Sequence, residues 1–96
     1  MSTCRVPRLA SPPRGPADAV WEGGGQAAVA LFHARSSQHR PEVAVRIGHT
    51  GDRLHLRFAV RDRWVISRTQ RVNGPVCTDS CVEFFVEPLP GGGYFN

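Results

Sequence analysis

The chain has 96 residues, which allows one domain at most. Hydrophobic residues make up 41% of it, and no apolar run approaches the roughly 20 residues of a membrane helix, so we expect no membrane insertion. With 10 glycines, 8 prolines and no heptad repeat, a coiled coil is excluded. The net charge is +4 and all 12 basic residues are arginine, but they are scattered rather than gathered in a patch, which predicts no nucleic-acid binding.

Three cysteines are present, Cys4, Cys77 and Cys81, and an odd count gives no closed disulfide framework. Cys77 and Cys81 could pair locally or supply half of a metal site. A structural zinc needs four ligands, however, and neither a second pair nor a nearby histidine is present. We therefore expect packed or reduced thiols, with no metal and no cofactor. No apolar stretch follows Arg5 and Arg8, so we expect no secretory signal, and the compartment stays unknown.

Residues 1–17 are rich in proline and arginine and have little to bury, which predicts a disordered or extended tail before a domain at residues 18–96. Trp21 is the first large apolar anchor. Residues 27–34 fit either a strand or a short helix. The glycines before this segment and the serines after it favour a strand.

The clearest pattern lies at residues 43–61. Apolar residues alternate there with polar or small ones on both sides of a turn: Val43, Val45, Ile47, Leu54, Leu56, Phe58 and Val60. Period-two alternation predicts an antiparallel hairpin, and Gly51 can supply the positive φ of a tight turn. We expect the apolar face to be packed and the opposite face to carry arginine and histidine into solvent.

Further strands are predicted at residues 64–70 and, more strongly, at residues 81–87, which end at Pro88. Residues 94–96 have the character of the start of another strand. In residues 81–87, alternation places valine and phenylalanine on a core face. The other face would carry Cys81, Glu83, Phe85 and Glu87. The pattern indicates several antiparallel strands of a larger sheet.

The block Asp-Ser-Cys-Val-Glu-Phe-Phe-Val-Glu-Pro at residues 79–88, followed by Gly-Tyr-Phe-Asn at residues 93–96, resembles carbohydrate-binding module family 9, and more closely its bacterial family 9-like branch. Weaker pieces at residues 32–41 and 54–65 come in the matching order, so that the resemblance covers residues 21–96. It implies an all-β antiparallel β-sandwich of the DOMON-like superfamily. The sandwich would be incomplete, truncated after about half of its strands.

The resemblance also implies a saccharide partner and four candidate carbohydrate-binding residues. Glu83 matches the carboxylate that binds sugar hydroxyls, whereas a clamping tryptophan of the family falls at Cys77, a departure from the pattern. Trp64 can be a sugar platform or a core residue. Asp79, with Ser80, can tie its loop to the backbone or contact a ligand.

The sequence contains no phosphate-binding loop and no nucleophile elbow, and the four histidines single out no metal or heme pair. We therefore expect non-catalytic carbohydrate binding rather than an enzyme. Two alternatives stay open: a DOMON-type domain that binds heme or another small ligand, and a truncated product without independent function. Self-association through the exposed sheet is also expected.

Overall fold

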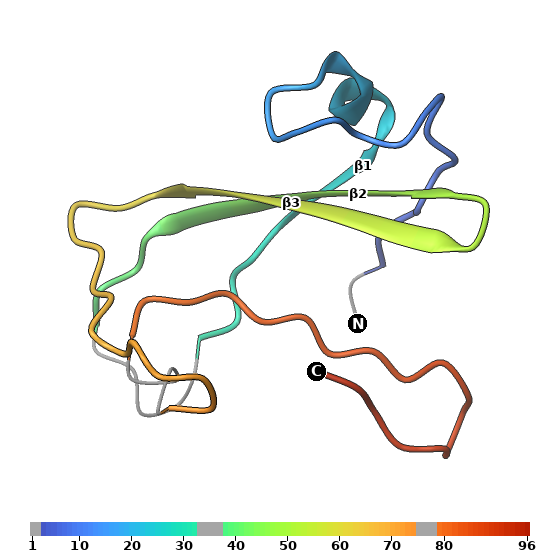
Figure 1. The fold of residues 1–96 in the computed structure, drawn as a ribbon. Helices are drawn as coiled ribbons and strands as arrows, with labels where there is room; N and C mark the ends of the chain where they lie inside the picture. The colour runs from blue at the N-terminus through green and yellow to red at the C-terminus, as the bar shows by residue number, and fades with distance from the viewer. Residues whose placement is uncertain (1–2, 33–37, 75–78) are drawn as a thin grey trace. The chain divides into compact units, whose positions relative to one another are not determined.

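The computed structural model describes residues 3–32, 38–74 and 79–96 (Figure 1). The chain divides into two units, Met1–Arg63 and Trp64–Asn96. Among the described residues of the N-terminal unit, the paired strands form one antiparallel sheet, and a parallel bridge joins the start of the chain to it. The predicted all-β antiparallel class is therefore confirmed.

The N-terminal unit is built on a three-stranded sheet in the order β1-β2-β3, with β1 at Gly25–Ala28, β2 at Glu42–Thr50 and β3 at Arg53–Arg61. The predicted hairpin is confirmed, with Val45 opposite Phe58 and Ile47 opposite Leu56. At the turn, Gly51 has φ 54°, the conformation that glycine adopts without a Cβ penalty. The first predicted strand, at residues 27–34, is confirmed only in part, since β1 begins at Gly25 and ends at Ala28, and residues 33 and 34 lie outside the described residues.

A 3-10 helix, η1, spans Ala19–Gly23. Asp18 caps it, because its Oδ1 accepts a hydrogen bond from the backbone N–H of Val20 at 3.0 Å. The helix carries Trp21, which is only 5% exposed and donates through Nε1 to the carbonyl of Gly15 at 3.0 Å.

The segment before η1, part of the predicted tail, is bonded to the sheet. Leu9 N–H donates to the His49 carbonyl at 2.8 Å, and His49 N–H donates to the Pro7 carbonyl at 3.0 Å. The Leu9 side chain is 4% exposed and lies directly over Gly48, where an added Cβ would meet it at 2.5 Å. One apolar residue and two backbone hydrogen bonds therefore hold this stretch in place.

The covered face of the sheet is the one that carries arginine, so the expectation that this face points into solvent is wrong. The Arg57 guanidinium donates to the Pro16 carbonyl at 3.0 Å and lies beside the Trp21 ring. On the apolar face, by contrast, Leu54 and Val60 are 51% and 48% exposed. In Figure 1, η1 and residues 10–18 just before it lie together on one side of the sheet. Arginine tolerates such cover because its stem packs against apolar groups while its head finds carbonyls and an aromatic ring.

Within its described residues, the C-terminal unit has a single isolated bridge, between Val86 and Phe95. Two reciprocal backbone hydrogen bonds of 2.9 and 2.7 Å form it. The predicted strands at residues 64–70 and 81–87 are therefore wrong, apart from Val86. A strand requires partners for its backbone groups, and β-propensity supplies none.

Candidate functional site

The four sequence-predicted site residues all belong to the C-terminal unit, and the structure describes three of them, Trp64, Asp79 and Glu83. Glu83 is exposed, and Trp64 is 61% exposed, which excludes a core role for this tryptophan. Cys77 lies outside the described residues.

Asp79 and Ser80 tie their loop to the backbone of residues 66–69. The Asp79 carboxylate accepts from Arg68 N–H at 3.0 Å through Oδ1 and from Thr69 N–H at 2.9 Å through Oδ2. Ser80 Oγ accepts from Ile66 N–H at 2.8 Å. The backbone donors, Thr69 first and then Arg68, lower the pKa of Asp79 because they favour its charged form. The structural interpretation of this pair is confirmed.

The C-terminal unit exposes an aromatic pair, Phe85 and Tyr94. Their ring centroids are 5.6 Å apart and the ring planes meet at 64°, an edge-to-face arrangement. The side chains are 52% and 69% exposed. Together with Val86 and Glu87 they line an open hollow of about 400 Å³.

The Val86–Phe95 bridge explains why these side chains meet. When residue 86 pairs with residue 95, Glu87 stands opposite Tyr94, and Phe85 is the diagonal neighbour of Tyr94 on the same face. The chain reverses through a glycine-rich turn in which Gly92 N–H donates to the Leu89 carbonyl at 2.8 Å.

The Glu87 carboxylate accepts one hydrogen bond within the protein and can accept others from a ligand. Its Oε1 accepts from the backbone N–H of Gly91 at 2.5 Å, which orients the carboxylate. A carboxylate offers about four acceptor positions, so most of them remain for hydroxyl donors. An aromatic face covers the apolar C–H side of a sugar ring, and a carboxylate accepts from its hydroxyls. Alternation places Phe85 and Glu87 on one face, but Tyr94 was not predicted to join them; the signal for it is the glycine turn that returns the chain to them.

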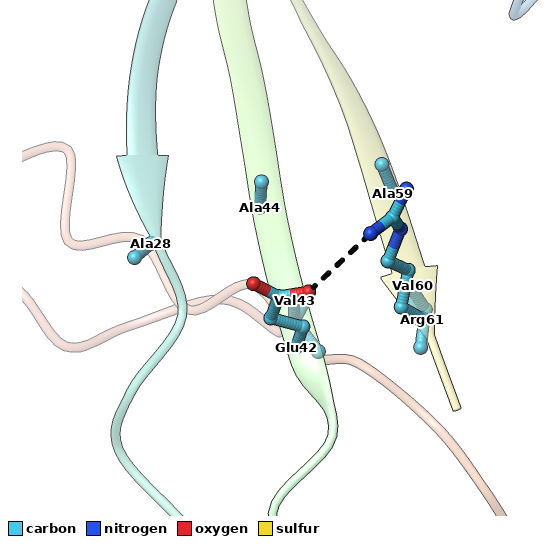
Figure 2. Close-up of a pocket in the computed structure, with 7 residues that line it drawn as sticks. All are labelled: Ala28, Glu42, Val43, Ala44, Ala59, Val60 and Arg61. Carbon is cyan, nitrogen blue, oxygen red and sulfur yellow. Dashed lines mark ion pairs between the residues drawn. The ribbon is translucent and has the colours of Figure 1, made fainter. Parts of the chain in front are cut away.

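A second hollow, of about 390 Å³, lies at the end of the sheet away from the hairpin turn (Figure 2). Its floor contains three alanines in register, with Ala28 opposite Ala44 and Ala44 opposite Ala59. Glu42 and Arg61 stand beside them, with 4.0 Å between Oε2 and Nη1. This pair is exposed, so solvent screens it and it adds little stability. This hollow was not predicted, because only the strand register aligns the alanines.

No helix among the described residues has the length and apolar character to span a bilayer. Nor do those residues gather three or more histidine, cysteine, aspartate or glutamate side chains in a group suited to a metal ion.

Comparison with known proteins identifies a family. The model of the family described as carbohydrate-binding family 9 matches residues 25–96, which contain all three strands and the aromatic pair. No curated protein and no solved structure matches the chain significantly. Since the matched region is three quarters of the chain, the protein belongs to carbohydrate-binding family 9.

Proposed function

We propose that the chain binds a saccharide without catalysing its reaction, and that the ligand lies on the Phe85–Tyr94 pair. The observation that carries this proposal is the pair itself, two exposed rings beside a carboxylate in an open hollow. The family match supports the ligand class. An exposed aromatic patch of this kind costs free energy in water, and a sugar ring that covers it removes that cost.

Each residue has a distinct role in this proposal. The faces of Phe85 and Tyr94 contact the C–H side of the sugar, and the Tyr94 hydroxyl adds a hydrogen bond. Glu87 accepts from two adjacent hydroxyls. Glu83 and Trp64, exposed in the same unit, are further proposed contacts.

The other two candidate residues, Asp79 and Cys77, have smaller roles in the proposed sugar site. The Asp79 carboxylate is engaged with two backbone N–H groups, so we assign it to the shape of the loop that precedes the site. Cys77 stands at the position of a clamping tryptophan in the resemblance, and its smaller side chain would make a weaker contact with a sugar.

A glycan array followed by calorimetry tests the proposal. We expect the chain to retain at least one neutral saccharide and to release no product from it on prolonged incubation. Tyr94→Ala should weaken binding about tenfold, since it removes an aromatic contact worth about 0.5–1.5 kcal/mol together with the apolar area that the ring covers. Tyr94→Phe should recover most of this loss.

Leu89→Ala is the matched control, because Leu89 is exposed in the same loop but does not line the hollow. Its affinity should stay within twofold of the unmodified chain. Failure of the folded chain to bind any saccharide would overturn the proposal, as would equal affinities for Tyr94→Ala and the unmodified chain. A Soret band that survives desalting after heme addition would favour the DOMON-type alternative instead.

A further inference from the structure

The hollow in the N-terminal unit is lined on one side by a row of long polar side chains, and a second such row follows its alanine floor on the other side. Successive rows on one face of a sheet are two residues, or about 6.6 Å, apart along each strand. The alanine row is followed on one side by Glu42 and Arg61, which face each other across β2 and β3. On the other side come three residues in register, Gln26, Arg46 and Arg57. The surface is hollow at the alanine row because the short alanine side chains lie between rows of long side chains.

The second row holds an uncompensated positive charge. Arg46 stands directly opposite Arg57, and like charges in this position destabilise a sheet. Their described polar contacts are to neutral carbonyls, from Arg46 Nη1 to Gly24 O at 3.4 Å and from Arg57 Nη1 to Pro16 O at 3.0 Å. Within the described part of the chain, neither guanidinium pairs with a carboxylate, and Arg57 Nε is buried without an acceptor. An anion beside this row would remove the repulsion.

We propose that the alanine-floored hollow is a second binding site whose ligand is an acidic saccharide unit with a carboxylate. The carboxylate faces Arg46 and Arg57, the hydroxyls reach Glu42 and Arg61, and an apolar side of the ring lies on the alanine methyl groups. The saccharide class rests on the proposed function, whereas the preference for an anion rests on the arginine row alone. A volume of about 390 Å³ is within the range of small-ligand sites.

Charge and size together determine this assignment. Glu42 and Arg61 line the hollow, and Arg46 and Arg57 stand in the next row of the same face. These rows therefore hold three arginines and one carboxylate, and their local charge favours a ligand with negative charge. Arginine binds carboxylates with paired N–H donors, which gives orientation as well as affinity. The methyl floor leaves room for a ring that a larger side chain would occupy.

Calorimetry of the full chain with galacturonate, compared with galactose, tests the site. We expect galacturonate to bind at least tenfold more tightly than galactose at this hollow, and its affinity to fall as salt increases. Arg46→Gln should weaken galacturonate binding about tenfold to a hundredfold. Ala59→Leu, on the exposed edge strand, should abolish the binding because leucine fills the floor.

Two matched variants control for charge and for size. Arg53→Gln removes the same charge from the same face near the hairpin turn, and Ala30→Leu adds the same bulk at an exposed position outside the strands. Both should bind galacturonate as the unmodified chain does, and circular dichroism should show every variant folded.

Tyr94→Ala separates this proposal from the first one, since it should keep galacturonate binding while it loses the neutral saccharide. Sulfate serves as a further probe: competition with galacturonate would show that the row recognises anionic groups in general, as proposed. Equal galacturonate affinity in Ala59→Leu and the unmodified chain would overturn the second site, and so would equal affinity for galacturonate and galactose.

Discussion

The guanidinium carbon of Arg57 lies 5.6 Å from the centroid of the Trp21 ring. This contact joins η1 to the charged face of β3, and it makes Trp21 one of the two buried apolar residues of the described chain. Cation–π attraction and a buried indole together stabilise the cover over the sheet.

We expect Trp21→Ala to reduce the stability of the N-terminal unit by about 3–5 kcal/mol, the usual cost of removing a buried aromatic side chain. The Nε1 hydrogen bond to Gly15 would be lost as well. Trp21→Phe should retain part of the packing but not that bond. Chemical denaturation measures the difference, with Leu31→Ala as the exposed control; equal midpoints for Trp21→Ala and Leu31→Ala would contradict the assigned role.

The second prediction concerns Leu9 and Gly48, whose contact holds the N-terminal segment. Gly48→Ala places a Cβ 2.5 Å from the Leu9 side chain, so Leu9 must move, at a cost of about 1–3 kcal/mol. Leu9→Ala creates space instead. The two effects should therefore not add: the double variant should be more stable than the sum of the single changes predicts. Simple additivity in a denaturation cycle would show that the two residues are not in contact.

The third prediction is a pH dependence at Asp79. Backbone N–H groups of Thr69 and Arg68 lower its pKa below the ordinary value of 3.8. The bonds that stabilise this loop are therefore fully present above pH 3.8 and are lost as the pH falls through the lower folded-state pKa. An NMR titration should show the amide signals of Arg68 and Thr69 shifting together below that pH. In Asp79→Asn this titration should vanish; a midpoint above 3.8 would refute the hydrogen-bonded arrangement.

The fourth prediction compares two carboxylates in saccharide binding. Glu87→Gln should lower affinity tenfold to a hundredfold, because it removes a charge-assisted hydrogen bond from the aromatic hollow. Glu83→Ala should have a similar effect if Glu83 has the role that the family resemblance implies. Calorimetry with the saccharide retained on the array measures both. Unchanged affinity in Glu83→Ala would assign Glu83 to solvent and leave Glu87 as the acceptor.

The fifth prediction concerns the apolar face of the sheet, where Leu54 and Val60 are about half exposed. We expect the chain to self-associate through this face, since exposed apolar patches drive association. Leu54→Lys combined with Val60→Lys should reduce the associated fraction in light scattering. Leu31→Lys, at an exposed position outside the strands, is the control and should leave it unchanged. A monomer at all concentrations before substitution would disprove this prediction.

The hairpin and its turn could be predicted because they depend on local pattern. Alternation over residues 43–61 determines which side chains share a face, and Gly51 determines where the chain can reverse. The covered face could not be predicted, since alternation distinguishes two faces without showing which one a distant segment contacts. Leu9 and Trp21 decide that, and they reach the sheet from outside the hairpin.

The two candidate binding sites, like the sheet, were predictable from the sequence only in part. The sequence by itself determined the family, the all-β class and the shared face of Phe85 and Glu87, because residue order and period-two spacing carry this information. Only the tertiary structure decided that Tyr94 joins them, through the Val86–Phe95 bridge, and that three alanines align into a floor. Both arrangements depend on strand register, and register is set by the hydrogen bonds between paired segments, which the residue pattern within one segment does not specify.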